Sequence, residues 1–208
     1  MSAFRASVQQ NDTYAFREHP VLTNNRKAYQ ELVPDMSGTT HHGIRRCDRC
    51  GELISKWNEP LLGVKIKKRK YDLSLTYDGI MIASELFRSM YTSNKLSGLK
   101  IRRLPDDPDF FAIHATKAIE FDAGRRQTRF IKPCQSCGRY ESVVGATPVF
   151  LKTGSEVSER EFVRTDLEFG IGDEKHPLLI CGRSAENAIW EAKPKGLDLI
   201  PIDEDVGR

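Results

Sequence analysis

Two short stretches, Cys47-Asp48-Arg49-Cys50-Gly51 and Cys134-Gln135-Ser136-Cys137-Gly138, decide how this chain of 208 residues is expected to fold. We call each of them a knuckle. A zinc ion binds four soft donors at tetrahedral corners about 2.3 Å away, and one Cys-x-x-Cys turn supplies two adjacent thiolates. The glycine that follows suits a left-handed backbone position, which directs amide hydrogens at the sulfurs. The predicted ligands of a structural zinc ion are Cys47, Cys50, Cys134 and Cys137.

Two other interpretations of these cysteines stay open. They can be unrelated buried thiols, or the two knuckles can be separate dithiol redox motifs. The identical spacing and the matching glycine weigh against the first interpretation, and neither knuckle is followed by the helix pattern typical of the second. Four thiolates leave no open position for water, so a structural metal is expected rather than a catalytic one.

The knuckles are far apart in the chain, so residues 52–133 between them are expected to form a folded insertion. This segment carries strand and helix patterns of its own. Closing a long loop adds little cost, because loop-closure entropy rises only with the logarithm of length. We therefore predict a zinc-ribbon-like site of four cysteines that joins two distant knuckles.

Strand patterns outnumber helix patterns. Residues 71–75 alternate between apolar and polar, which is the period of a half-buried strand. Ser84 is expected to cap a helix that ends by Gly98, and Ser184 a second helix that runs to Ala192. Further strands are expected near residues 64–66, 99–102, 110–115, 118–121, 129–132, 142–144, 149–151, 178–181 and 197–202. The predicted class is α+β, with a mainly antiparallel or mixed sheet and a few short helices.

The rest of the chain predicts an arm followed by one domain. Residues 1–40 are polar and weakly patterned, and we expect an arm or loop there with one helical turn near residues 26–32. Residues 41–208 are expected to form a single α+β domain. The first ten residues lack the apolar core of a signal peptide, and no apolar stretch is long enough to span a membrane. A cytoplasmic location without a membrane partner is expected, and an odd count of five cysteines agrees with this.

Charges of opposite sign are separated along the chain, although the net charge of +3 is small. Basic residues gather at 65–70, 100–103 and 125–132. Aromatic residues are not interleaved with them, so nucleic acid is an unlikely partner and solvated faces are favoured. Residues 155–174 are acidic, which suits either a solvated loop or the docking of a charged partner. The candidate partner-binding residues are Asp166, Glu168, Asp173 and Glu174.

The chain is not expected to be an enzyme, because no set of nucleophile, base and orienting group can be drawn from its residues. Cys181 lies near His176 and can be considered as a nucleophile, but a thiol buried in a strand is the favoured interpretation. His114 lies in an alternating segment, where a partly buried, hydrogen-bonded ring is expected.

Together these features resemble a known family. The two knuckles, the strand Tyr71-Asp72-Leu73-Ser74, and the segment Phe162-Val163-Arg164-Thr165-Asp166-Leu167-Glu168-Phe169-Gly170 followed by Pro177-Leu178-Leu179-Ile180 resemble the double-CxxCG motif immunity proteins of bacterial polymorphic toxin systems. The resemblance covers residues 40–203 and is most specific in the knuckles. It implies a cytoplasmic, non-enzymatic protein that binds and neutralises a cognate toxin. The alternative, from a different class, is a zinc-ribbon adaptor that binds nucleic acid through the basic runs.

Overall fold

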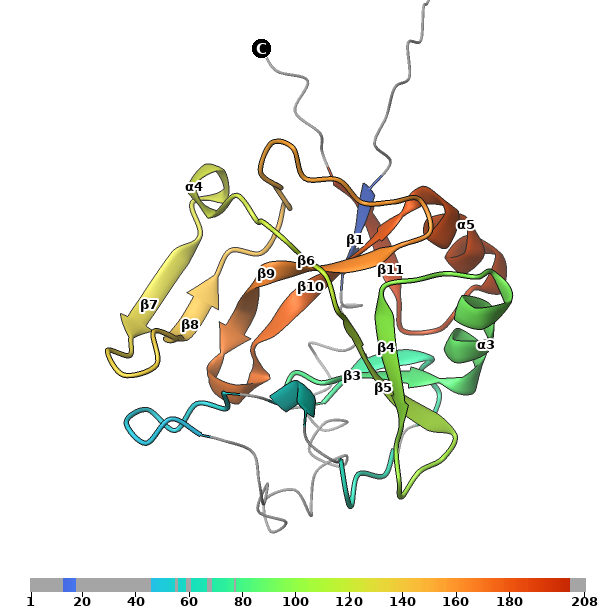
Figure 1. Ribbon diagram of the computed structural model, residues 1–208, viewed down its shortest axis with the longest axis horizontal. Helices are drawn as coiled ribbons and strands as arrows, with labels where there is room; N and C mark the ends of the chain where they lie inside the picture. Colours follow the sequence, from blue (N-terminus) through green and yellow to red (C-terminus); the bar gives the residue numbers. More distant parts are fainter. Residues whose placement is uncertain are drawn as a thin grey trace, which may run out of the picture.

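Two β-sheets and a few short helices make up the part of the chain that the computed structural model describes, which is residues 13–17, 46–54, 56–58, 61–66, 69–76 and 78–202 (Figure 1). Neighbouring strands are antiparallel in all pairs but one. The predicted α+β class with antiparallel and mixed sheets is therefore confirmed.

The larger sheet has seven strands and carries the longest hairpin. Its spatial order is β11 (Asp198–Pro201), β1 (Thr13–Arg17), β10 (His176–Gly182), β9 (Phe162–Ile171), β8 (Tyr140–Val144) and β7 (Arg129–Pro133). The seventh strand, β6 (Ala118–Ile119), pairs in parallel with β9. The second knuckle connects β7 to β8 and so forms the tip of a hairpin.

The smaller sheet has four antiparallel strands. Its spatial order is β2 (Leu73–Leu75), β3 (Met81–Ser84), β5 (Phe110–Ala115) and β4 (Leu99–Arg103). It approaches β9 at Gly98, whose φ is +90° and whose missing Cβ would lie 2.0 Å from the Phe162 carbonyl oxygen. Only glycine allows this close approach of the two sheets.

Three helices and two 3-10 turns complete the described elements. They are α3 (Glu85–Ser93), α4 (Ala123–Arg126), α5 (Arg183–Ala192), η1 (Lys56–Asn58) and η2 (Gly172–Glu174). Ser84 caps α3 as predicted, because its hydroxyl accepts a hydrogen bond from the Phe87 amide. At α5 the predicted serine cap is wrong. The helix begins after Gly182, and Ser184 instead donates to Glu159. No described helix combines the length and apolar content needed to cross a bilayer.

Alternation along the central strands divides the interior into two cores. On β9, Phe162 faces the smaller sheet and α3, whereas the next residue, Val163, faces the opposite side. On β10, Leu179 and Cys181 belong to the first core and Ile180 to the second. Successive side chains of a strand point to opposite faces, so β9 and β10 are buried on both sides.

A third core covers the other face of the smaller sheet. There Ile82 and Ala112 pack under Leu61, Val64 and Ile66, which lie in irregular backbone. The strand predicted at residues 64–66 is therefore absent, because these apolar residues cover a sheet instead of extending it. Residues 149–151 likewise form only a single bridge, between Leu151 and Phe121.

The N-terminal arm predicted for residues 1–40 requires a correction at Thr13–Arg17. This segment is β1, which lies between β10 and β11. Pairing with strands 165 to 187 residues away is a long-range backbone interaction, so the local sequence pattern does not reveal it. The helical turn predicted near residues 26–32 lies outside the described residues.

The predicted insertion, residues 52–133, contains all four strands of the smaller sheet. Its later part does not stay separate, since β6 and β7 join the larger sheet. The first core is also shared: Leu73 and Phe87 from the insertion pack with Phe162 and Ala185 from beyond it. The insertion and the following segment therefore bury their apolar surface together.

Candidate metal centre

The two knuckles have the same backbone structure. The Gly51 amide donates to the Cys47 carbonyl at 2.8 Å, and the Gly138 amide to the Cys134 carbonyl at 2.9 Å. Each turn is closed by a second hydrogen bond, from the Cys47 amide to Glu52 and from the Cys134 amide to Arg139. Both glycines adopt the predicted left-handed conformation, with φ of +75° and +72°. The repeated sequence pattern thus produces a repeated turn.

The structure brings the four predicted ligands together. Cys47 Sγ lies 3.8 Å from Cys134 Sγ, and Cys50 Sγ lies 3.7 Å from Cys137 Sγ. All four sulfur atoms lie within 4.8 Å of one another. Each knuckle faces the other across 87 residues of sequence. Four thiolates about 2.3 Å from a common centre lie at separations of this size, so the cluster can hold one metal ion.

Backbone amides favour the thiolate form at the first cysteine of each knuckle. The Cys50 and Arg49 amides lower the pKa of Cys47 to about 6. The Cys137 and Ser136 amides lower the pKa of Cys134 in the same way. A thiolate, not a thiol, is the form that binds metal.

The second cysteine of the first knuckle behaves differently. The Glu52 amide lowers the pKa of Cys50, but burial and the hydrogen bonds with the three other thiols outweigh this and raise it to about 12. Negative charge already present on a neighbouring sulfur makes a second thiolate costly unless a cation joins the cluster. The site is therefore chemically suited to a bound cation.

Two arginines anchor the knuckles on the β9–β10 hairpin. Arg46 donates to the Gly51 carbonyl at 2.7 Å and to the Asp173 carboxylate at 3.0 Å. Arg139 donates to the Ile54 carbonyl at 3.0 Å, and it also contacts Glu168 on β9. The hydrogen bond from Arg139 to Ile54 joins the residue after the second knuckle to the segment that follows the first knuckle.

A buried lysine forms a second connection between the knuckles. Lys175 is 4% exposed, and its ammonium group forms an ion pair with Glu52, which is 8% exposed and directly follows the first knuckle. The same ammonium donates to the Tyr140 carbonyl at 2.5 Å, just beyond the second knuckle. One cation thus connects both knuckles to the start of β10 without any metal.

A second buried lysine lies beside this connection. Lys56 Nζ donates to the Lys175 carbonyl and lies 3.9 Å from a Glu168 carboxylate oxygen. Burial lowers the pKa of Lys56, while Glu168 acts in the opposite direction. Glu168 is therefore shared between Lys56 and Arg139.

Three of the four candidate partner-binding acids have internal contacts. Asp166 accepts a hydrogen bond from the Phe121 amide at 2.9 Å, and Asp173 and Glu168 form the ion pairs described above. Asp166 and Glu174 are exposed, whereas Glu168 and Asp173 are half-buried. Part of the acidic segment thus serves to hold the knuckles, and of the four candidates Asp166 and Glu174 remain accessible.

Cys181 and His114, which the sequence also suggested as candidate residues, lie apart from the metal centre. Cys181 is fully buried in the first core, and burial raises the pKa of its thiol. His114 is half-buried and stacks on Trp57, with ring centroids 5.3 Å apart. The structure brings neither of them to the cysteine cluster.

The groups that hold the knuckles in place were not predicted from the sequence. Glu52 and Lys175 are far apart in the chain, so their pairing carried no local signal. The two arginines did carry one, because Arg46 directly precedes the first knuckle and Arg139 directly follows the second. Comparison of this sequence with protein-family models gives no match, and comparison with curated proteins gives none either.

Proposed function

We propose that this chain is a zinc-binding immunity protein, which neutralises a cognate bacterial toxin in the cytoplasm by binding to it. The observation that carries the proposal is the convergence of two Cys-x-x-Cys-Gly knuckles from distant parts of the chain. This doubled motif is the feature by which the sequence resembles the double-CxxCG immunity proteins. The protein acts through a binding surface, and the metal has a structural role.

The donor set supports zinc as the ion. Four thiolates in a tetrahedral arrangement are typical of structural zinc sites, and soft sulfur ligands disfavour magnesium and calcium. Native mass spectrometry of the purified chain should show one bound zinc ion. The variant Cys47→Ser/Cys134→Ser, which lacks one ligand from each knuckle, should show none, while Cys181→Ala should keep the ion.

Exposed large apolar side chains support a role in binding a partner. Trp190 on α5 is 59% exposed and Ile171 at the end of β9 is 62% exposed. Aromatic residues and arginines are typical anchors of interfaces, and a standard complex buries about 1,600 Å² in total. Asp166 and Glu174 supply exposed negative charge on the same hairpin as Ile171.

Co-expression with the toxin tests the proposal directly. The toxin domain encoded beside this chain should arrest growth when expressed alone, and co-expression of this chain should restore growth. Purified toxin and this chain should also form a complex of defined stoichiometry in size-exclusion chromatography. Unchanged toxicity together with no complex would show that the proposal is wrong.

A further inference from the structure

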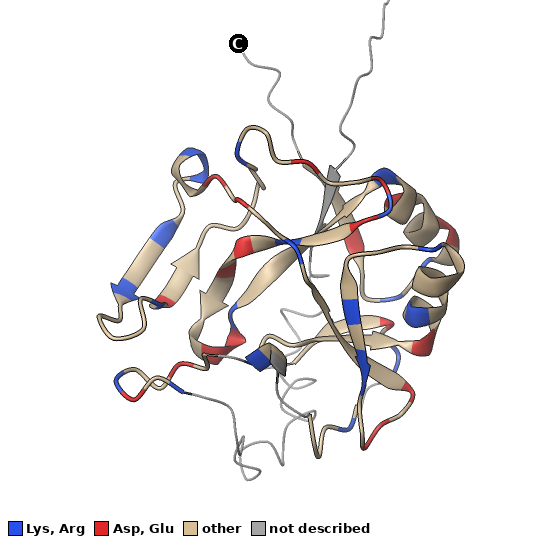
Figure 2. Cartoon of the chain, viewed as in Figure 1, with Lys and Arg blue, Asp and Glu red and all other residues tan. Residues whose placement is uncertain are grey.

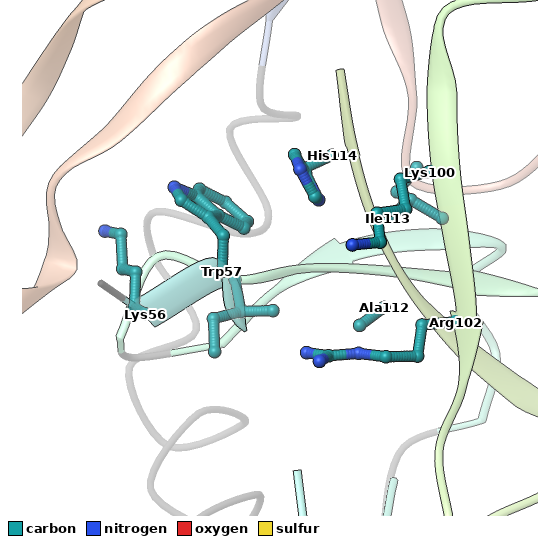
Figure 3. Close-up of a pocket in the computed structure, with 8 residues that line it drawn as sticks. Lys56, Trp57, Lys100, Arg102, Ala112, Ile113 and His114 are labelled. Carbon is teal, nitrogen blue, oxygen red and sulfur yellow. The ribbon is translucent and has the colours of Figure 1, made fainter. Parts of the chain in front are cut away.

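A hollow unrelated to the cysteine cluster lies on the face of the smaller sheet at β4 and β5 (Figure 3). Trp57 and His114 form one side of it. From β4, the side chains of Lys100 and Arg102 extend toward Trp57. Its remaining lining residues are Lys56, Ile80, Ala112 and Ile113.

Strand register explains why two cations meet an imidazole ring here. Lys100 and Arg102 are two residues apart on β4, so their side chains lie on one face. In the antiparallel pair, Lys100 is opposite His114 and Arg102 is opposite Ala112. Directly opposite residues project to the same side of a sheet, which places both cations beside the His114 ring.

The two cations that β4 contributes to this hollow have no carboxylate partner among the described residues, whereas Lys56 lies 3.9 Å from Glu168. Each charged residue among the described lining residues is a cation, and β4 itself carries only basic charges (Figure 2). In the described part of the chain, neither Lys100 nor Arg102 has an ion-pair partner. Many other cations do have one, for example Lys117 with Glu161 at 3.0 Å and Lys152 with Glu120 at 2.7 Å.

A second hollow extends the positive region past the aromatic pair. It shares Trp57, Ile113 and His114 with the first hollow and adds Arg164 from β9. It too has no Asp or Glu among its described lining residues. His114 lines both hollows and makes no hydrogen bond to the described residues, although the sequence predicted a hydrogen-bonded ring. Burial and the cations Lys100, Arg164 and Arg102 lower the pKa of His114, which keeps the ring neutral and able to donate one hydrogen bond.

We propose that this hollow binds a phosphoryl group between Lys100, Arg102 and His114. Arginine and lysine are the usual ligands of phosphate oxygens, and charge-assisted hydrogen bonds of this kind are short and strong. The hollow itself has room for about one water molecule, so a compact oxyanion at its mouth fits better than a large ring system. This inference is independent of the proposed immunity function and of the metal centre.

Tryptophan fluorescence provides a direct test, because the chain has only two tryptophans. In the full-length Trp190→Phe variant, Trp57 is the single reporter and lies in the hollow itself. Titration with inorganic phosphate should change its emission saturably. In the same background, Lys100→Gln/Arg102→Gln should weaken phosphate binding at least about tenfold, since two charge-assisted hydrogen bonds are lost.

A matched control distinguishes the loss of binding groups at this site from a general effect of net charge. Arg129→Gln/Lys195→Gln removes the same charge from two exposed residues on other elements, and it should change the affinity by no more than about twofold. A second titration uses adenosine monophosphate in place of inorganic phosphate. Tighter binding than phosphate assigns the site to a phosphomonoester, and equal binding assigns it to free phosphate.

Three results would overturn the assignment. They are no saturable response of Trp57 to phosphate, equal affinity in Lys100→Gln/Arg102→Gln, and binding of the dicarboxylate succinate as tight as that of phosphate. Circular dichroism checks the fold of each variant. If the double variant does not fold, the exposed Lys100→Gln substitution alone must weaken phosphate binding at least about threefold.

Discussion

At the scale of single residues, the five cysteines show how environment decides the chemistry of one side chain. Those of the knuckles lie at the edge of the molecule, where backbone amides lower the pKa of Cys47 to about 6. Cys181 has the same thiol, yet burial raises its pKa and keeps it in the protonated form. Sulfur reactivity follows thiolate content and access, so these cysteines should differ sharply in reactivity.

We therefore predict that a metal chelator exposes four reactive thiols and no more. In native buffer with chelator, a chromogenic thiol reagent should modify Cys47 and Cys134 first, because backbone amides lower their pKa, and Cys50 more slowly, because its pKa is raised to about 12. Cys137 completes the set of four, while Cys181 should react only after addition of denaturant. Mass mapping of the labelled peptides identifies the sites. Labelling of Cys181 at the rate of the other four would contradict this prediction.

His114 predicts a pH dependence of stability. Its pKa in the folded protein lies below the ordinary value of 6.5, because of burial and the neighbouring cations Lys100, Arg164 and Arg102. As the pH falls below about 6.5, the unfolded ring binds a proton before the folded ring does, so the free energy of unfolding decreases. The free energy of unfolding stops decreasing, as far as His114 is concerned, once the ring is protonated in the folded protein too.

Urea denaturation at about pH 7.5 and about pH 5 measures this effect. The loss of stability between the two pH values should be smaller in His114→Gln than in the original protein. Equal losses would show that other groups cause the pH dependence. His176, which is also half-buried, provides the control substitution His176→Gln.

At the scale of elements, the β9–β10 hairpin positions the metal centre. Arg46 and Arg139 bind the acids Asp173 and Glu168, and Lys175 connects Glu52 with the Tyr140 carbonyl. These contacts orient both knuckles through groups other than the cysteine sulfurs. A preorganised ligand set loses less conformational entropy when the metal enters.

The buried pair of Lys175 and Glu52 predicts a large effect of substitution. Lys175→Met should lower the free energy of unfolding by about 3–5 kcal/mol, because it leaves the Glu52 carboxylate buried without a partner. The double variant Lys175→Met/Glu52→Gln should recover part of this loss. Chemical denaturation measures both values.

The exposed pair of Lys152 and Glu120 is the matched control for the buried one. Their side chains are 59% and 63% exposed. Lys152→Met should cost far less than Lys175→Met, since solvent screens an exposed pair. Similar losses for the two lysine variants would show that burial does not control the strength of the Lys175 contact.

At the scale of the whole molecule, the metal centre and the hydrophobic cores occupy different regions. Of the four metal-cluster cysteines, none belongs to the three apolar clusters, which form around the two sheets. β9 and β10 are buried on both faces and connect the first two clusters. Local stability should therefore differ between the knuckles and the central strands.

Removal of the metal should consequently loosen the knuckles before it affects the sheets. In hydrogen exchange monitored by mass spectrometry, chelator should increase exchange of residues 46–54 and 134–140, while the central part of β9 and β10 stays protected. Loss of protection in all regions at the same chelator concentration would mean that the ion stabilises the whole fold cooperatively. The variant Cys181→Ala serves as a control that leaves the cluster intact.

Much of the local structure followed from short patterns. The helix cap at Ser84 and the left-handed glycines of the knuckles depend on neighbours within about four residues, and the sequence alone predicted them. The predictions that were wrong concerned residues whose structure depends on non-local interactions. Val64 and Ile66 cover a sheet, and Thr13–Arg17 pairs with strands from the far end of the chain. Such interactions depend on tertiary packing, which overrides local β-propensity.

By itself, the sequence determined the α+β class, the two knuckles and the identity of the four candidate metal ligands, because Cys-x-x-Cys-Gly specifies both a turn and its chemistry within five residues. Only the tertiary structure decided that knuckles 87 residues apart meet, that Lys175 connects them, and that Lys100 and Arg102 lie beside His114. Strand register and sheet order bring these groups together, and neither is encoded by neighbouring residues alone.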